Sequence, residues 1–409
     1  MKRAIIISAI LLLSCASASA QWYLYPGNNR KNTGDVPVLP DTSEQRDTVT
    51  VSDGTDVAIV EGAEPVISEA YSADIPEVLK VALILPFQTS TNPSANFLEM
   101  YSGALLAVRD FGRTGSKVEL TVLDETDAEA PLTAETLADN HLTVGPVNMD
   151  DILAGTDICP RDRYLISPLE PKATALVDSC RIVQIPVHWK CQVDNLVSWL
   201  RKDTDWDDQL VIIKDTDEKG IGEQTEYLLS KLAETGKKFQ TVSSPNEIQV
   251  SRNGVTRCVI ASERDPFINT TARGLSILTA KYENLVLYGT SKVRNSSGMS
   301  IDYLYNLNTH YTAAYFIDYE NEATRDFVLA YRALFKNEPG SFAFQGYDTM
   351  HYFLNIYAKY GVQWYKKLPE FSERGLQCDF SFTDSDTVGR TNSAVRRVVL
   401  GKDLSATLQ

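Results

Sequence analysis

The sequence predicts an α/β protein of two lobes, each built on a mainly parallel β-sheet with helices on its faces. Two observations support this fold class. Short apolar runs alternate along the chain with segments of helical periodicity, and the joints between them are short. The chain also has 409 residues, which is more than one ordinary domain needs and suits two lobes with additional segments.

The first expected strand is Leu79–Leu85, an almost continuous apolar run that is typical of a central parallel strand covered on both faces. Pro86 ends it. A helix is expected over Asn96–Phe111, where apolar residues recur at helical spacing, and the glycine-containing residues 112–115 end that helix. Lys117–Leu123 is the next expected strand. Strand, helix and strand with short joints form a βαβ unit, which requires a parallel sheet.

The same alternation continues through the rest of the first lobe and into the second, which is expected to begin at Trp189. Further helices are expected over Leu132–Asn140, Asp150–Ala154, Pro171–Val177, Gln192–Lys202, Thr225–Thr235 and Pro266–Ala280. Further strands are expected over His141–Val144, Tyr164–Ile166, Arg181–Pro186, Gln209–Ile213, Thr256–Ala261, Asn284–Tyr288 and His310–Phe316. The tail segments Cys378–Phe382 and Ala394–Leu400 are expected as strands of the second lobe.

A pair of helices is expected late in the chain. Glu322–Phe335 has one apolar stripe at helical spacing and Asn321 as its N-cap. The segment 336–340 stops this helix, because asparagine and glycine tolerate a left-handed backbone and Pro339 cannot continue a helix. A second helix, apolar on nearly every side, is expected to open at Tyr347-Asp348 and to be buried.

This order of helix, Glu-Pro, loop, Gly-Tyr-Asp and helix resembles the late part of type I periplasmic binding proteins, the fold of branched-chain amino-acid binding proteins and of receptor ligand-binding domains. Two strand ends, Gly145-Pro146-Val147 and Ser167-Pro168-Leu169, follow the same family order, and the resemblance extends over roughly residues 80–401. It implies that residues 79–188 and 309–372 form the first lobe and that residues 189–308 and 373–409 form the second. It also implies three crossings of the chain between the lobes.

The N-terminus is expected to direct export. Residues 1–20 combine a charged start, the apolar run Ala4–Leu13 and a small-residue cleavage site ending at Ala20, as in a signal peptide. A competing interpretation places a lipid on Cys15, whose preceding residues loosely resemble a bacterial lipobox. Residues 21–78 are acidic and lack apolar periodicity, which predicts a disordered linker. The expected location is the periplasm or the cell envelope.

Charge and motifs exclude several functions. The formal net charge of −15 argues against nucleic acid and anionic membranes as partners, and no later stretch is long and apolar enough to span a bilayer. Catalytic patterns are incomplete: Gly220-Ile221-Gly222 lacks the third glycine of a dinucleotide motif, and residues 289–293 lack the closing glycine of a nucleophile elbow. Histidines and cysteines show no metal-ligand spacing. We therefore expect no enzyme activity, no metal and no cofactor.

Candidate ligand contacts follow from position. Ligands of open parallel sheets bind beyond the carboxyl ends of the strands, so side chains there are candidates for holding a small polar solute, an amino acid among them. Strand ends must also turn, so Gly, Ser and Asp there have a purely structural interpretation as well. The candidates are Phe87, Gln88, Gly145, Pro146 and Ser167 in the first lobe, Asp215, Ser262, Glu263 and Thr290 in the second, and Tyr347 from the buried helix.

Export places the cysteines in an oxidising compartment that permits disulfides. Cys159 and Cys180 each precede an expected strand at the same edge of one sheet, which brings a disulfide between them within reach. A second bridge between Cys191 and Cys378 is a weaker expectation, and Cys258 is expected to be a buried free thiol. The alternative of five reduced cysteines stays open at this point.

Three functions compete. The first is a non-enzymatic solute-binding protein of the envelope, in transport, whose two lobes close on a small polar ligand. The second is an envelope protein that binds a protein partner with the same fold and regulates it, for example a regulator of cell-wall synthesis. The third is an enzyme on a doubly wound fold, which the missing catalytic pattern makes the weakest. A binder should have a closed polar pocket, and a scaffold a filled or shallow one.

Overall fold

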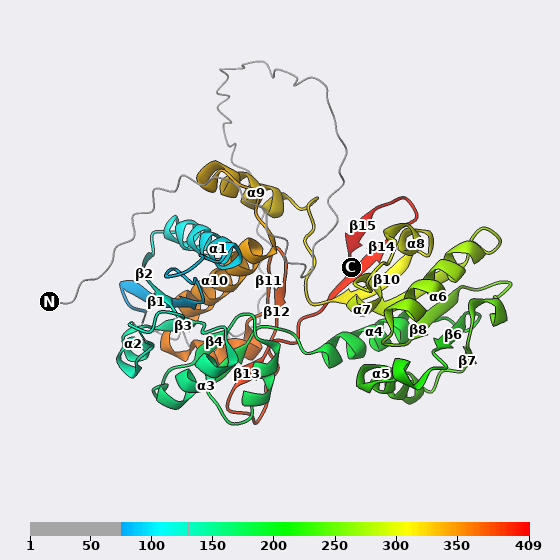
Figure 1. Cartoon of the computed structure of the whole chain (residues 1–409), viewed down its shortest axis with the longest axis horizontal. Helices are drawn as coiled ribbons and strands as arrows, with labels where there is room; N and C mark the ends of the chain where they lie inside the picture. Colours follow the sequence, from blue (N-terminus) through cyan, green and yellow to red (C-terminus); the bar gives the residue numbers. More distant parts are fainter. Residues whose placement is uncertain (1–74, 130) are drawn as a thin grey trace, which may run out of the picture. The chain divides into compact units, whose positions relative to one another are not determined.

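The computed structural model describes residues 75–129 and 131–409. The expected signal peptide, Cys15 and almost all of the expected linker over 21–78 lie outside these residues. The described chain forms two lobes, each a sheet flanked by helices (Figure 1). The α/β class with parallel sheets is therefore confirmed. Within the described part of the chain, no helix combines the length and the apolar character that crossing a bilayer requires.

The sheet of the first lobe has the strand order β13-β5-β4-β3-β1-β2, and every pair in it is parallel. Its central strand β1 is buried over its last five residues, as the continuous apolar run predicted. The strands are β1 (Val78–Leu85), β2 (Lys117–Asp124), β3 (Leu142–Val144), β4 (Leu165–Ser167), β5 (Ile182–Gln184) and β13 (Arg390–Thr391).

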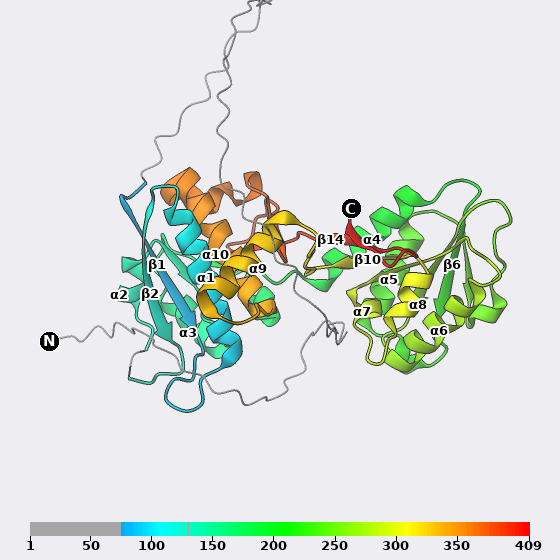
Figure 2. The same ribbon diagram turned by 90° about the horizontal axis from the view of Figure 1, so that it is seen from above.

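Helices cover both faces of this sheet, and α1, α9 and α10 lie together on one side of it (Figure 2). Helices α1 and α10 cross closely at Gly103 and Gly346. A Cβ atom at Gly103 would lie 1.9 Å from the Ala343 carbonyl oxygen, so this crossing requires glycine. The helices of this lobe are α1 (Ala95–Gly112), α2 (Ala134–Asp139), α3 (Met149–Ile158), α9 (Glu322–Phe335), α10 (Ser341–Tyr360) and the 3₁₀ helices η1 (Pro171–Leu176) and η4 (Gly361–Glu370).

The sheet of the second lobe has the order β15-β14-β10-β9-β8-β6-β7, with β14 and β15 antiparallel to their neighbours. Its strands are β6 (Gln209–Lys214), β7 (Phe239–Val242), β8 (Thr256–Ala261), β9 (Leu285–Thr290), β10 (Thr309–Ala313), β14 (Arg396–Leu400) and β15 (Ala406–Leu408). Its helices are α4 (Trp189–Asp203), α5 (Glu223–Glu234), α6 (Asp265–Leu278), α7 (Ser291–Arg294), α8 (Ile301–Asn306), η2 (Glu218–Gly220) and η3 (Pro245–Glu247). Separate apolar clusters form against the two faces.

The structure corrects the expected lobe boundaries at two places. Strand β10 was expected in the first lobe, within 309–372, but it pairs with β9 and β14 in the second sheet. Residues 373–409 were expected in the second lobe, but β13 (Arg390–Thr391) pairs with β5 of the first sheet. The segment Cys378–Phe382 was also expected in the second lobe. Its strand β12 (Asp379–Phe380) instead pairs with β11 (Glu373–Arg374), and the ring of Phe380 stacks on Tyr352 of α10 at 4.4 Å. Its aromatic side chains are thus buried in the core of the first lobe. The three crossings stay a prediction.

The buried helix α10 begins at Ser341, six residues before the expected start at Tyr347. The expected start was too late because Gly346 is a poor helix former and so suggests a helix boundary. In the structure Gly346 lies inside α10, where its lack of a side chain permits the close crossing with α1. Strand β7 and the short helices α7 and α8 were not expected. Strand β7 is partly exposed and carries no continuous apolar run, which hides it from a periodicity argument.

Candidate functional site

The carboxyl edge of the first sheet begins with Phe87 and Gln88, directly after β1. Phe87 is buried and meets Tyr101 of α1 edge-on, with ring centroids 6.0 Å apart, so its side chain belongs to the core. Gln88 is exposed and has a left-handed backbone with φ of 58°. Its N–H donates to the carboxylate of Asp124 at the end of β2, 3.3 Å away. Of these two candidates, Gln88 is the one exposed to solvent.

Gly145 and Pro146 form the turn after β3. Gly145 has a φ of 100°, and a Cβ atom there would lie 2.0 Å from the Ile84 carbonyl oxygen. Its N–H donates to the Ile166 carbonyl at 2.8 Å, which ties the turn to β4. The peptide bond between Gly145 and Pro146 is cis. Glycine is therefore required by the backbone, and its candidacy as a ligand contact rests on the position of the turn.

Ser167 ends β4 and is paired in register with Gln184 of β5. Residues in register on neighbouring parallel strands point to the same face. Gln184 Nε2 donates to the Glu170 carbonyl at 2.6 Å, which orients the amide. The Ser167 hydroxyl and Gln184 Oε1 are both buried and bond no other group of the described residues. Buried polar atoms in proteins normally have a partner, so Ser167 keeps its place as a candidate contact.

Glu125, which follows β2, was not among the candidates. Its carboxylate accepts the N–H groups of Val147 at 2.8 Å and Asn148 at 3.2 Å, together with a bond from the Asn148 side chain. These donors precede α3, where helix N–H groups have no partner inside the helix. Burial raises the pKa of Glu125 to about 7, against the lowering effect of these hydrogen bonds. An internal carboxylate thus fills a position that would suit an anionic ligand group.

At the carboxyl edge of the second sheet, the side chains of Ser262 and Arg264 both donate hydrogen bonds to Asp215. Asp215 accepts from the Ser262 hydroxyl at 2.6 Å and from Arg264 Nε and Nη2 at 2.9 and 2.7 Å. The Asp215 side chain has no exposed surface, whereas that of Arg264 is 35% exposed. The hydrogen bonds from Arg264 lower the pKa of Asp215 to about 2. The carboxylate of Asp215 is thus held inside the lobe.

Glu263 and Thr290 lie at the same edge and hold helix N-termini. The Glu263 carboxylate accepts the N–H groups of Gln224 at 2.9 Å and Thr225 at 3.2 Å, in the first turn of α5. The Thr290 hydroxyl accepts the N–H of Lys292 at 3.3 Å and caps α7. Both polar groups therefore have structural partners, as the simpler interpretation of strand-end residues predicted.

The structure does not bring Tyr347 to this group of candidates. Its hydroxyl donates to Asp110 at 3.3 Å, and its ring stacks on His351. Asp110 lies in the last turns of α1, and α1 starts at the carboxyl end of β1 and returns along the sheet, so Tyr347 faces toward the amino ends of the strands. The neighbouring Asp348 is also structural, because it accepts the N–H groups of residues 376–378.

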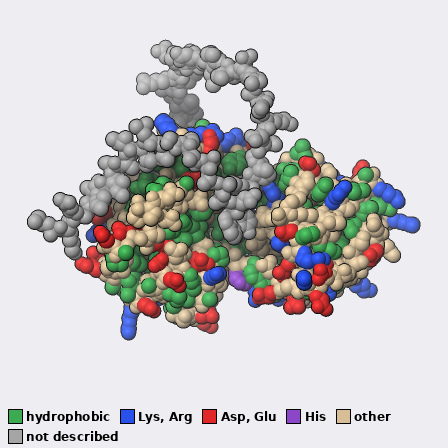
Figure 3. Space-filling model, in the orientation of Figure 1, with side chains coloured by type: hydrophobic (Ala, Val, Ile, Leu, Met, Phe, Trp, Pro, Cys, Tyr) green, Lys and Arg blue, Asp and Glu red, His purple; other side chains and the backbone are tan. Residues whose placement is uncertain are grey.

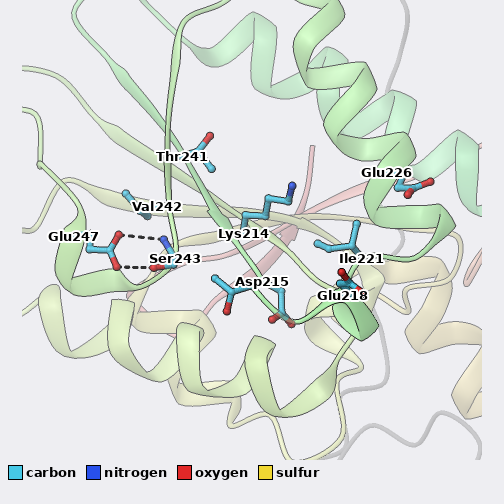
Figure 4. Close-up of a pocket in the computed structure, with 10 residues that line it drawn as sticks. Lys214, Asp215, Glu218, Ile221, Glu226, Thr241, Val242, Ser243 and Glu247 are labelled. Atoms are coloured by element: carbon cyan, nitrogen blue, oxygen red, sulfur yellow. Dashed lines mark hydrogen bonds between the residues drawn. The ribbon is translucent and has the colours of Figure 1, made fainter.

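A pocket of about 740 Å³ opens at the carboxyl ends of β6 and β7 (Figure 4). Asp215 lies in its wall, while the other lining residues were not candidates. Lys214 and Asp215 point in opposite directions, and Lys214 extends toward α5, which carries Glu226. The lining residues are Lys214, Asp215, Thr216, Glu218, Ile221, Glu226, Thr241, Val242, Ser243 and Glu247.

Three charged side chains of this pocket have no partner in the part of the chain that the structure describes. Lys214, Glu218 and Glu226 make no hydrogen bond or ion pair through their side chains to any described residue. Glu247 accepts from Ser243. The pocket thus offers one ammonium group and two carboxylates that are free to bind charges of opposite sign. The sequence signal was the strand end Lys214-Asp215-Thr216, from which only the aspartate was selected. On the face shown in Figure 3, acidic and basic side chains are interspersed.

The expected disulfide is not formed. All five described cysteines are free thiols. Cys159 Sγ is buried and donates to the Arg163 carbonyl at 3.4 Å, whereas Cys180 Sγ lies 3.6 Å from the Ser179 hydroxyl and is partly exposed. Cys191 and Cys378 are unpaired as well, and Cys258 is a buried free thiol, as expected. Among the described residues, no group of three His, Cys, Asp or Glu side chains is arranged to hold a metal ion.

Comparisons with known proteins concern the fold. No family model and no curated protein matches the sequence. Among solved structures, the chain is similar to a protein assigned as a branched-chain amino acid ABC transporter from Rhodospirillum rubrum, at 15% identity and a TM-score of 0.55, over 81% of this chain and 100% of that one.

Two further structures have lower TM-scores. A leucine-bound ABC transporter substrate-binding protein from Desulfitobacterium hafniense is 16% identical, with a TM-score of 0.44, over 81% of this chain and 100% of that one. The C-domain of LpoA from Haemophilus influenzae, a regulator of PBP1A, is 11% identical, with a TM-score of 0.45, over 81% of this chain and 99% of that one. Together with the strand order above, the match at a TM-score of 0.55 shows that this chain has the type I periplasmic binding protein fold.

Proposed function

We propose that this protein is a non-enzymatic solute-binding protein, exported to the periplasm or cell envelope, whose lobes close on a small polar ligand. The observation that carries the proposal is the pocket of about 740 Å³ at the carboxyl ends of β6 and β7. Its volume lies in the range of pockets that hold small molecules, and its position is where open parallel sheets bind ligands. In the structure the pocket is open to solvent and lined by the second lobe alone, so the proposal requires that closure of the lobes encloses it. The fold match supports the same class of function.

The charges of the pocket indicate the ligand class. Lys214 can bind a carboxylate, and Glu218 and Glu226 can bind an ammonium group, since none of the three is engaged elsewhere in the described residues. We therefore propose a zwitterion such as an amino acid. In the first lobe, the Ser167 hydroxyl and Gln184 Oε1 can bond a further polar group of a ligand. Gln88 and the turn at Gly145-Pro146 remain proposed contacts because of their place at the strand ends.

Thermal-shift measurements with amino acids test the proposal. A true ligand at 100 times its Kd stabilises the folded protein by about 2.7 kcal/mol. Amines without a carboxylate and acids without an amine should raise the Tm less. The variant Lys214→Gln should weaken binding about 10- to 100-fold, because a charge-assisted bond is lost. Lys219→Gln, close in sequence but outside the pocket lining, is the matched control. Small-angle scattering should show contraction on binding. A panel in which no solute raises the Tm would refute the proposal.

One observation favours a second candidate, an envelope protein that regulates a protein partner. Several polar groups at the expected contacts are already engaged: Asp215 by Arg264, and Glu263 and Thr290 by helix N-termini. Because these polar groups already have partners within the protein, they do not require a ligand to satisfy them. If no solute binds, affinity capture from envelope extracts should recover one defined partner with the wild-type chain. Recovery of nothing specific would refute this second candidate.

A further inference from the structure

Strand β2 differs from the other strands at the edges of the two sheets. It has eight residues and pairs with β1 over its whole length. The other edge strands are short: β13 has two residues, β15 has three and β7 has four. Proteins commonly shorten edge strands, because unpaired backbone groups there invite another strand to pair. Strand β2 contains neither Pro nor Gly and keeps a long regular edge.

The backbone groups on the outer side of β2 have no partner among residues 75–129 and 131–409. The N–H of Glu125 donates to the Leu85 carbonyl of β1, and the direction alternates along a strand. The backbone groups of Val118, Leu120 and Val122 therefore point away from β1. Their N–H and C=O groups bond no described residue outside the strand pair. Within the described part of the chain, this edge thus presents a regular row of six backbone groups without a partner.

The side chains of these three residues are apolar and lie on one face. Val118 and Leu120 pack partly against the core of the first lobe. Val122 is further out, with 38% of its surface exposed. The strand carries Lys117 and Glu119 in its amino half and Asp124 at its carboxyl end, and Lys117 pairs with Glu77. A parallel neighbour of the same sequence would meet like charges, whereas an antiparallel neighbour places unlike charges near each other.

We propose that β2 pairs antiparallel with β2 of a second copy of this chain about a two-fold axis at Leu120. In this register, Leu120 is opposite Leu120 of the other copy. Val118 of each copy is opposite Val122 of the other. All six open backbone groups of each copy then bond across the interface, and Val122 is covered. On the other face, Glu119 is opposite Thr121, so no like charges are opposed. The two sheets become one continuous sheet.

Light scattering after size exclusion and disulfide trapping test this pairing with the full exported chain. The wild-type chain should be a dimer at physiological salt, which screens the repulsion between two copies of this acidic chain. Val122→Pro should be monomeric yet folded, because the N–H it removes points outward and proline is tolerated on edge strands. Phe239→Lys, a change on the edge strand β7, should leave the dimer intact.

The register is tested with two single-cysteine additions. A mixture of Glu119→Cys and Thr121→Cys chains should form a mixed disulfide dimer on oxidation, because opposed residues of a non-hydrogen-bonded pair have Cα atoms about 4.5 Å apart. Each variant alone should crosslink no more than the wild type, whose own cysteines set the background. Crosslinking of either variant alone would refute the register. A wild-type chain that stays monomeric at the highest soluble concentration would refute the proposal. If hydrogen exchange then shows that the backbone amides at the β2 edge of this monomer are protected, another segment covers the edge, and the proposal is refuted in that case too.

Discussion

The ion pair between Asp215 and Arg264 is the polar contact of the candidate site whose removal is easiest to quantify. Asp215 is fully buried at its side chain, while Arg264 is partly exposed. Replacing Asp215 by asparagine keeps the shape of the side chain and removes its charge. Arg264 can still reach water and Asp217, so the change measures what the buried carboxylate contributes.

The magnitude follows from the pKa. The hydrogen bonds from Arg264 lower the pKa of Asp215 from its ordinary value of 3.8 to about 2. At about 1.36 kcal/mol per pKa unit, this difference corresponds to about 2.4 kcal/mol of stability at neutral pH. The variant should therefore lose about 2–3 kcal/mol, which lowers the Tm of a lobe of this size by about 5–10 °C.

The pH dependence of stability is a second measure of the contribution of the Asp215 carboxylate to the unfolding free energy. The pKa of Asp215 is lower in the folded chain than in the unfolded chain, so its contribution is complete above about pH 4 and is lost as the pH falls toward about 2. The gap in unfolding free energy between wild type and Asp215→Asn should thus be full at neutral pH. It should shrink in acid.

Urea unfolding followed by circular dichroism measures both effects. The matched control is Asp217→Asn, since Asp217 contacts the same arginine at 2.7 Å but its side chain is 42% exposed. An exposed pair of this kind contributes less than about 1 kcal/mol. If the two variants lose the same stability, or if the loss at Asp215 persists unchanged in acid, burial of the carboxylate is not what matters.

Three further measurements concern Glu125, Gly145 and Cys258. Burial raises the pKa of Glu125 from 4.5 to about 7, so ionisation of this carboxyl group destabilises the folded chain. The wild type should therefore lose stability relative to Glu125→Gln as the pH rises from about 4.5 to about 7. Parallel curves of unfolding free energy against pH for the two proteins would contradict this. Gly145→Ala places a Cβ atom 2.0 Å from the Ile84 carbonyl and should lower the unfolding free energy by more than about 2 kcal/mol, unlike Gly112→Ala, where the space is open. Burial raises the pKa of Cys258 to about 12, so this thiol should react with a thiol reagent only after unfolding, and rapid labelling of the native chain would refute its placement.

The pocket lies at one of the strand ends to which the sequence pointed, but the sequence did not predict which side chains are free there. The rule that ligands meet the carboxyl ends of parallel strands led to Asp215 and to the strand end where the pocket opens. It could not separate a free side chain from an engaged one. Arg264 lies 49 residues after Asp215, and the partners of Glu125, Val147 and Asn148, lie 22 and 23 residues after it. No local sequence pattern predicts contacts over such separations. A lysine at a strand end carries no distinctive spacing, so the sequence does not single out Lys214.

Hydrophobic periodicity predicted the order and type of nearly all long elements, because it is a local property that does not depend on which elements become neighbours. Strand β8 has the expected bounds at both ends. The tertiary structure alone decided which sheet each strand joins. The residues of β10 (THYTA) carry no local signal for either lobe, and its place beside β9 and β14 depends on backbone hydrogen bonds to distant strands. Likewise, Phe380 is buried in the first lobe because Tyr352 offers it a stacking partner, which no reading of residues 378–382 alone can show.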